Sequence, residues 1–273
     1  MVTQMKPNSH PWLEKEIKKM NKSLKNSRFG PVIYVAETGS TNTDLLNQVS
    51  ENASDGTVLV TGYQKAGRGR LERHWKAPSG ANLLFSVLLY PKIEVEKMPL
   101  ITPALASALI DVLESYGLAA GMKWPNDVLL TGDSSGKVAG ILAEVADTET
   151  SAVVIGMGCN VAWPETEISE LPNAVSLLAA GKKVQPPALL LAVLLSFEKY
   201  LIMLQQPEGA ENLRGILLQK SVTIGKKVSV QQLGARISGQ AVDLRTNGAL
   251  VIENSGGLHH IMVGDITHLH VEE

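Results

Sequence analysis

The stretch "TVLVTGYQKAGRGRLERHWKAPSGANLLFSVLLY" (residues 57–90) places a basic loop between two apolar runs. The runs 57–64 and 82–90 are β-branched or apolar and of strand length, so we expect the loop to join two strands. Within 12 residues the loop contains one acid, Glu72, and five cations, Lys65, Arg68, Arg70, Arg73 and Lys76. Because like charges at this density repel one another, the loop predicts an anionic ligand.

Two properties of this loop favour phosphate or carboxylate as the anion. The planar guanidinium of arginine can engage two oxygens at once. Gly67 and Gly69 lack the Cβ atoms that would keep the backbone from wrapping closely around a ligand. Taken alone, the loop leaves open an exposed arginine-rich connector or a nucleic-acid patch. Nucleotide-binding motifs do not decide the question, because no GxxxxGK[ST] is present and "GMGCN" (156–160) has only two glycines.

The composition is that of a globular protein without a general excess of positive charge. The 273 residues hold 25 Lys and Arg against 27 Asp and Glu, a formal net charge of −2, and 44% of them are hydrophobic. The longest uncharged apolar run, 184–197, is shorter than the roughly 20 residues of a membrane span, and the N-terminus lacks the apolar core of a secretion signal. We therefore expect a cytoplasmic protein without membrane contact. The single cysteine, Cys159, excludes an internal disulfide and a multi-cysteine metal site.

Apolar spacing and turn residues predict the other elements. Apolar residues three and four apart predict a helix over 13–24, and residues 40–42 are of types whose side chains cap a helix N-terminus. Proline at the start and glycine at the end mark an apolar helix over 99–117, and a second one spans roughly 187–204. Segments typical of successive strands of one sheet are "MKWPNDVLL" (122–130), "KVAGILAEVAD" (137–147) and "SAVVIGMGCNVAW" (151–163).

These elements predict an α+β fold with a mixed β-sheet and helices grouped on one face, since no uniform series of βαβ units appears. From residue 221 onward, short alternating segments divided by Gly, Asn and Asp predict a small β-barrel. The expected parts are a basic helical segment (1–30), a main domain (31–218) and the barrel (219–273). The seven Lys or Arg and two Glu of residues 1–30 are interpreted as the solvated face of a helix, because a helix-turn-helix needs about three helices.

Two further stretches indicate ligand contacts. In "KWPND" (123–127), Lys123 and Asp127 flank a stiff Trp-Pro pair, an unusual composition for a strand interior. Lys137 begins an otherwise apolar strand, although a solvent-facing lysine at a hairpin end is the simpler interpretation of that position.

Several of these motifs, in this order, closely resemble those of the biotin protein ligases. They are "STNTDLL" (40–46), the arginine loop, "KWPNDVLL" (123–130), "GKVAGILAEV" (136–145) and "IGMGCNV" (155–161). The resemblance covers about residues 32–161, and the C-terminal barrel resembles the family's SH3-like domain less specifically. It implies the class II synthetase-like catalytic fold that lipoate ligases share, although their motifs differ from the arginine loop and "KWPND".

The resemblance also implies a reaction and its partners. Biotin and MgATP would give biotinyl-5′-adenylate and pyrophosphate. A lysine of a biotin carboxyl carrier protein would then attack the mixed anhydride. Because the first step presses a carboxylate against a triphosphate, cations around both anions would stabilise its transition state. No covalent enzyme intermediate is needed, so Cys159 is expected to be a buried small residue rather than a nucleophile.

Site residues are implied by the same resemblance. Those for the ureido ring of biotin are Ser40, Thr41, Gln64, Gly67 and Arg68. Gly140 and Leu142 would line the channel for the valeryl tail, and Lys137 would contact the carboxylate oxygen that becomes the acyl-phosphate bridge.

The implied catalytic side chains are Lys137, Arg68, Arg70 and Arg73, the arginines facing carboxylate and phosphates. Residues implied for ATP are Arg70, Arg73, Trp75, Lys123, Asn126 and Asn160. The two asparagine amides would read adenine, and the indole would form an apolar wall. Asp127 is the candidate ligand of Mg²⁺, an ion that usually rides on phosphates and water.

Some features depart from the family pattern or leave alternatives open. Glu72 and Asp265 stand where family members often have Gly and Glu respectively. The alternatives are a ligase for another carboxylated cofactor, such as lipoate or a fatty acid, and a non-catalytic biotin-sensing regulator. A homodimer is left open, and specific DNA binding is not expected. Without ligand, residues 65–76 are expected to be disordered or to adopt several conformations, because the five cations lack a counter-ion and the glycines add backbone freedom.

Overall fold

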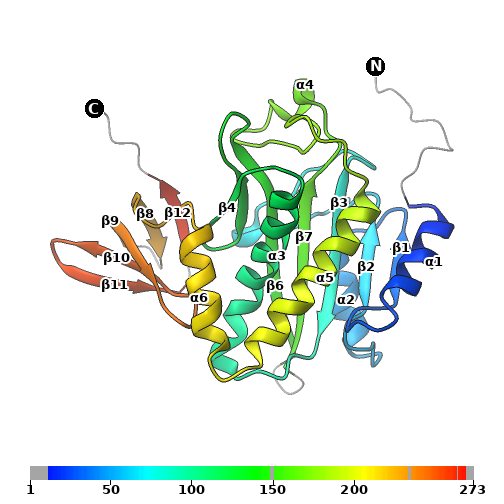
Figure 1. Cartoon of the computed structure of the whole chain (residues 1–273), viewed down its shortest axis with the longest axis horizontal. Helices are drawn as coiled ribbons and strands as arrows, with labels where there is room; N and C mark the ends of the chain where they lie inside the picture. Colours follow the sequence, from blue (N-terminus) through cyan, green and yellow to red (C-terminus); the bar gives the residue numbers. More distant parts are fainter. Residues whose placement is uncertain (1–11, 148–150, 233–234, 263, 269–273) are drawn as a thin grey trace. The chain divides into compact units, whose positions relative to one another are not determined.

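The computed structural model describes residues 12–147, 151–232, 235–262 and 264–268 (Figure 1). The chain divides into two compact units. The first comprises Met1–Pro91 and Val138–Leu195, and the second comprises Lys92–Lys137 and Ser196–Glu273. The expected division into 1–30, 31–218 and 219–273 stays a prediction.

A mixed sheet forms the centre of the fold, with strand order β1-β2-β3-β7-β6-β5-β4. Its strands in the first unit are β1 (Val32–Val35), β2 (Val58–Thr61), β3 (Asn82–Leu89), β6 (Gly136–Asp147) and β7 (Ala152–Asn160). β1 and β2 are parallel, whereas β2–β3, β3–β7 and β6–β7 are antiparallel. The mixed sheet with helices confirms the expected α+β class.

Side chains along β7 point alternately to the two faces of the sheet, and on one face they leave room for a site. Residues 153, 155, 157 and 159 share one face, and residues 152, 154, 156 and 158 share the other. The second set changes from Ala and Val to two glycines along the strand. Helix α2 (Thr41–Val49) packs Leu45 against Leu88 and Val154 on that face. The helix therefore covers the aliphatic end of the face and places its N-terminus toward the glycines.

In the second unit, a 3₁₀ turn η2 (Val95–Leu100) leads into α3 (Ile101–Ser115). α5 (Pro186–Leu204) joins the two units, and α6 (Gly209–Lys220) follows it. Over the described residues, Val95–Ser115 and Pro186–Leu204 are long and apolar enough to span a membrane, by length and composition only. Because 67% and 56% of their most apolar windows are buried in the structure, both helices have the character of core helices.

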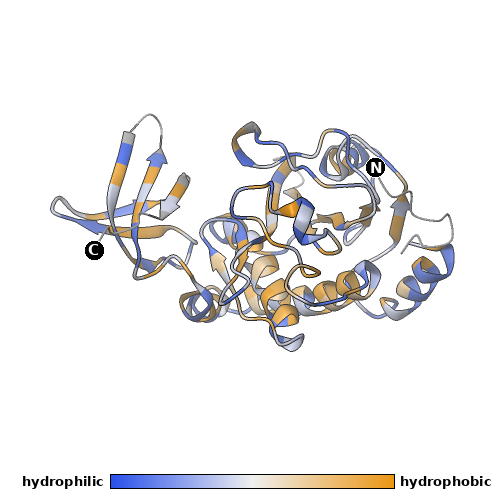
Figure 2. Ribbon diagram, turned by 90° about the horizontal axis from the view of Figure 1, so that it is seen from above, coloured by the Kyte–Doolittle hydropathy of each residue, from blue (hydrophilic) through white to orange (hydrophobic). Residues whose placement is uncertain are grey.

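The C-terminal strands form a separate antiparallel sheet in the order β11-β10-β9-β8-β12. They are β8 (Lys227–Gln232), β9 (Ala235–Leu244), β10 (Leu250–Asn254), β11 (Gly257–Ile261) and β12 (Asp265–His268). Polar and apolar residues alternate along β8, whereas β10 begins with the three buried apolar residues 250–252, and Figure 2 shows residues of both kinds in these strands. This agrees with the expected small SH3-like barrel.

Some predicted elements differ in the structure. "MKWPNDVLL" is a hairpin of β4 (Ala120–Lys123) and β5 (Asp127–Leu130), because the Trp-Pro-Asn segment turns the chain. Sequence patterns also missed α4 (Glu165–Ile168) and α6, whose apolar residues are too few or too scattered for a stripe. Ser40 precedes α2 as expected, but its side chain makes no capping hydrogen bond.

The outer edge of β1 is covered by α1 (Glu14–Ser23), and Trp12, two residues before this helix, contacts a side chain of the strand. Asn21 Oδ1 accepts the N–H of Val32 at 2.8 Å, and Asn21 Nδ2 donates to the carbonyl of Val32 at 3.1 Å. The ring of Trp12 stacks on that of Tyr34, with centroids 5.9 Å apart. The Asn21 amide thus occupies a position where another strand could otherwise pair with this edge.

Asn21→Ala is therefore expected to lower the free energy of unfolding by about 1–3 kcal/mol, because it leaves two polar backbone groups of a buried residue without partners. Urea denaturation monitored by circular dichroism measures the change. Lys22→Ala, at the exposed neighbouring position of α1, is the control. Equal stability of the two variants would contradict the role of Asn21.

Candidate active site

The N-terminus of α2 is capped by a side chain from another segment. Gln64, which follows β2, accepts the backbone N–H of Thr41 at 2.9 Å through Oε1. The same oxygen lies 3.2 Å from Thr41 Oγ1. The structure thus brings together two of the residues implied for the ureido ring, and it buries Ser40 beside them.

A continuous polar chain runs from Thr41 across the glycine face of the sheet. Thr41 Oγ1 lies 2.6 Å from Ser86 Oγ, and Ser86 donates to Asn42 Oδ1 at 2.6 Å. Asn42 Nδ2 donates to Glu144 at 2.8 Å, and Glu144 pairs with Arg68 at 2.6 Å. This polar chain of side chains therefore connects the neutral residues implied for biotin with an arginine of the basic loop.

Two glycines of β7 make room for this arrangement. A Cβ on Gly156 would lie 2.2 Å from Asn42 Oδ1 and 3.0 Å from Ser86 Oγ. A Cβ on Gly158 would lie 2.4 Å from the indole of Trp75. Both glycines of "IGMGCN" are thus required sterically, because the Asn42 amide lies against Gly156 and the Trp75 ring lies against Gly158.

The basic loop has a defined path in the structure. Residues Arg68 and His74 form an antiparallel bridge, and η1 (Arg70–Glu72) makes the turn between them. Within this turn Leu71, which is exposed, has a φ of 53°, a left-handed conformation uncommon for a branched residue. A Cβ on Gly67 would lie 2.6 Å from the carbonyl oxygen of Trp75, so this glycine allows close approach of the loop to itself.

The premise that the loop cations lack counter-ions is wrong, as Lys65 and Arg68 show. Lys65 pairs with Glu37 at 2.6 Å, and Arg68 pairs with Glu144 at 2.6 Å. The hydrogen bond and charge of Glu37 raise the pKa of Lys65 above its ordinary value. These carboxylates lie far from the loop in sequence, which is why local charge counting missed them. Ordering of the loop by ligand stays a prediction.

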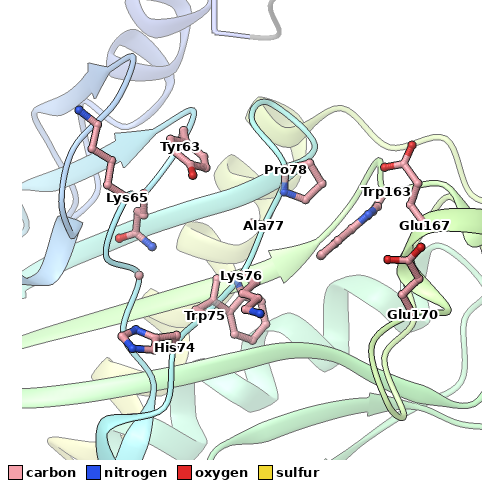
Figure 3. A pocket seen from close by; sticks show the side chains of 12 residues that line it. Tyr63, Lys65, His74, Trp75, Lys76, Ala77, Pro78, Trp163, Glu167 and Glu170 are labelled. Atoms are coloured by element: carbon pink, nitrogen blue, oxygen red, sulfur yellow. The ribbon is translucent and has the colours of Figure 1, made fainter. Parts of the chain in front are cut away.

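A cavity of about 650 Å³ lies beside the loop (Figure 3). One side is lined by residues 63–65, Gly67 and 74–78, and the other by Trp163, Glu167 and Glu170. Figure 3 shows the two carboxylates on the side opposite Lys65 and Lys76. This distribution of charge would direct an anionic group of a ligand toward the loop.

Trp163 supplies an apolar wall that the sequence did not single out. Its side chain is 8% exposed, and its Nε1 is buried without a hydrogen-bond partner among the described residues. The indole of Trp75 lies in the same cavity and over Gly158, consistent with the apolar wall implied for it. Two tryptophans thus flank the space available to a ligand.

In the second unit, the β4–β5 hairpin presents the polar residues of "KWPND". Lys123 and Asp127 are paired across the hairpin, and Lys137 Nζ lies 2.7 Å from Asp127 Oδ1. Trp124 is buried and donates from Nε1 to the carbonyl of Gly248 at 3.0 Å. The tryptophan of this motif therefore holds the hairpin to the C-terminal domain, a structural role that the sequence did not indicate.

The remaining site residues lie on β6, β7 and the hairpin turn. Gly140 faces Gly158 in the β6–β7 register, with Leu142 opposite Gly156, and Asn126 lies in the turn between β4 and β5. The amide of Asn160 is buried: its oxygen accepts from Asn82 at 3.0 Å, and its nitrogen donates to the carbonyl of Val175 at 3.2 Å. These bonds anchor the segment after β7, and contact of Asn160 with adenine stays a prediction.

Cys159 lies on the opposite face of β7 from the two glycines and is fully buried. Burial raises the pKa of its thiol to about 12. The thiol is therefore protonated at neutral pH, as a residue without a nucleophilic role would be.

Cys159 is accordingly expected to react with a thiol reagent such as 5,5′-dithiobis(2-nitrobenzoate) at pH 8 only after denaturation, and Cys159→Ala to retain adenylation within about threefold. Absorbance of the released thiolate in native buffer and in guanidinium measures the first, and pyrophosphate exchange the second. Stoichiometric labelling of the native protein would contradict the burial.

Comparison with known proteins defines the class. Residues 34–160 match the model of the biotin/lipoate A/B protein ligase family, and residues 223–269 match that of the biotin protein ligase C-terminal domain. The chain is 36% identical to the biotin--[acetyl-CoA-carboxylase] ligase of Mycobacterium tuberculosis, over 86% of this chain and 88% of that protein. It is 31% identical to the bifunctional ligase/repressor BirA of Bacillus subtilis, over 86% of this chain and 73% of that protein.

A solved structure gives the same result. The biotin protein ligase of Aquifex aeolicus in complex with biotin and ATP superposes with a TM-score of 0.77 at 28% identity, covering 88% of this chain and all of that chain. The chain belongs to the biotin protein ligase family.

Proposed function

We propose that this chain is an ATP-dependent ligase that forms biotinyl-5′-adenylate and then transfers biotin to a lysine of a biotin carboxyl carrier protein. The observation that carries the proposal is the polar chain that links Gln64 and Thr41 to Arg68. Neutral hydrogen-bonding groups suit an uncharged ring, and an arginine at the other end suits a carboxylate. The ligases named above support the same substrate, and the retained loop arginines and Lys137 support catalysis rather than sensing alone.

In the first step, a carboxylate oxygen of biotin attacks the α-phosphorus of ATP and the bond to pyrophosphate breaks. Arg70 and Arg73 would neutralise the negative charge that the two reactants bring together. Lys137 would donate a hydrogen bond to the oxygen that becomes the bridge of the mixed anhydride. In the second step, the neutral amine of the carrier lysine attacks the acyl carbon, the bond from that carbon to the phosphate oxygen breaks, and an amide, AMP and one proton are formed.

Magnesium is the metal that such a reaction uses, and one carboxylate fits its usual mode of binding. Asp127 is the candidate, with its Oδ1 2.7 Å from Lys137. Within the described ranges no group of three or more His, Cys, Asp or Glu side chains could hold a metal. Mg²⁺ would therefore be held mainly by phosphates and water, where it would neutralise charge on the triphosphate.

Incubation of the protein with labelled biotin, MgATP and a biotin carrier domain tests substrate, reaction and partner together. We expect label on the carrier lysine, and no label on a carrier whose acceptor lysine is replaced by arginine. Isothermal titration with biotin, lipoate and octanoate compares the candidate acids directly. Binding of lipoate or octanoate without biotin binding would overturn the proposal. The cytoplasmic location stays a prediction.

A further inference from the structure

The polar chain that runs from Gln64, in the cavity wall, to Arg68 contains residues to which the family resemblance gave no role. Asn42 and Ser86 are 4% and 0% exposed, and Glu144 is the only acid in the apolar strand 138–146. Buried polar groups are normally retained only when each donor and acceptor is satisfied. The number of protons that the polar chain contains therefore determines the direction of each of its hydrogen bonds.

The orientation of the Asn42 amide is fixed by acceptors on one side. The carboxylate of Glu144, paired with Arg68, and the carbonyl of Leu142 both face the amide, at 2.8 and 3.1 Å. Neither of them can donate a proton, so the NH₂ group of Asn42 must face them and uses both of its protons there. The amide oxygen is left facing Ser86.

This orientation decides the direction of the next two hydrogen bonds. Ser86 Oγ must donate its single proton to Asn42 Oδ1, which lies 2.6 Å away. The contact of 2.6 Å between Ser86 and Thr41 is also a hydrogen bond, and its proton can come only from Thr41. Gln64 Oε1, which accepts the Thr41 N–H, is a second acceptor within reach of the Thr41 hydroxyl at 3.2 Å, but the single hydroxyl proton goes to the shorter contact with Ser86.

We infer that Glu144, Asn42 and Ser86 are positioning residues that fix the hydroxyl of Thr41 as a hydrogen-bond acceptor toward the ligand. With its proton committed to Ser86, Thr41 offers only lone pairs, next to the carbonyl-type oxygen of Gln64. This pair of acceptors selects a ligand group with an N–H, such as a cyclic urea, and opposes one with an oxygen at the same position. The inference rests on the proposed function and specifies how the ureido ring is distinguished.

The test compares biotin with its two cyclic carbamate analogues, in each of which one ureido N–H is replaced by oxygen. The replacement keeps the ring shape and exchanges a donor for an acceptor. We expect the wild-type protein to bind biotin at least about a hundredfold more tightly than one of the two analogues, measured by isothermal titration. Equal affinity for biotin and both carbamates would overturn the inference without any variant.

Ser86→Ala is the informative variant, because it removes the acceptor at 2.6 Å and leaves the Thr41 proton able to turn toward Gln64 Oε1 or toward a ring oxygen of the ligand. The preference for biotin over the disfavoured carbamate is expected to fall at least about tenfold, as Thr41 can then donate to the ring oxygen. In Glu144→Gln, Oε1 can still accept from Asn42, so the preference should be retained. Glu37→Ala, which removes the matching ion pair to Lys65 of the same loop, should also leave the preference unchanged.

The outcomes separate this inference from the proposed function. Wild-type protein that fails to bind biotin refutes the function itself. Wild-type protein that binds biotin, with an unchanged preference in Ser86→Ala, refutes only the positioning role. Affinity for ATP, measured in parallel, reports whether Ser86→Ala is folded. If Ser86→Ala is not folded, two variants of Thr41 replace it in the test. Thr41→Ser keeps the hydroxyl and should keep the preference for biotin over the carbamate, whereas Thr41→Val should lose it.

Discussion

Replacement of Arg70 and Arg73 together by glutamine will slow biotin-dependent ATP–pyrophosphate exchange by at least about a thousandfold at saturating substrates. The reaction brings a carboxylate onto a triphosphate, and each guanidinium offers a positive charge where negative charge accumulates. Both arginines lie in the short segment around η1 of the loop beside the cavity. Because the charge is greatest in the transition state, the rate at saturation should fall more than either binding constant.

Lys182→Gln combined with Lys183→Gln is the matched control, since it removes two positive charges from the same unit outside the loop. We expect its exchange rate to stay within about threefold of the wild type, because neither lysine lines the cavity and charges in contact with solvent are screened by salt. A loss below tenfold in the arginine variant, or equal losses in both variants, would show that the loop charges do not carry the adenylation step.

The basic loop illustrates what the sequence could and could not predict. Its position between two strands and its charge were evident, because strand pattern and charge density are local properties. The partners of Lys65 and Arg68 were not, because Glu37 and Glu144 reach the loop only through the sheet register and the segment before α2. The close approach of Gly67 to the backbone of Trp75 was not evident either, whereas contact of this cavity-lining glycine with a ligand stays a prediction.

The residues of the polar chain left a signal that could have been followed. Ser86 is the one polar residue within the apolar stretch 83–89, and Glu144 is the one charge within 138–146. A single polar residue inside an apolar strand needs a buried partner, so such positions are candidates for a network even when their partners are unknown. The partners themselves depend on which strands are neighbours in the sheet, and the pattern of polar and apolar residues in the sequence does not contain that information.

The hairpin at "KWPND" shows a different limit. One apolar stretch was predicted as a single strand, whereas Trp124 and Pro125 turn the chain between β4 and β5. The turn places Lys123 opposite Asp127, and Asp127 beside Lys137. Local composition did identify these residues as unusual, but the reason for the buried tryptophan, its bond to Gly248, lies more than a hundred residues away.

Lys137→Met is expected to reduce the rate of biotinyl-adenylate formation by about a hundredfold or more, with a change in the dissociation constant of biotin below about threefold. The lysine would contact the oxygen that becomes the anhydride bridge, whereas most of the affinity for biotin would come from the ureido end near Thr41 and Gln64. Single-turnover formation of adenylate gives the rate, and isothermal titration gives the affinity. Lys97→Met, which removes another ion-paired lysine of the second unit, is the control.

The division between rate and affinity decides what Lys137 does. If it only binds the carboxylate in the ground state, both quantities fall together, because the same contact is lost before and after the barrier. If it only stabilises the hairpin through Asp127, the melting temperature falls and Lys137→Arg, which keeps the charge, restores both rate and stability. A rate loss without loss of affinity or stability, and at most partial recovery with arginine, is the result that places a compact ammonium at the reacting oxygen.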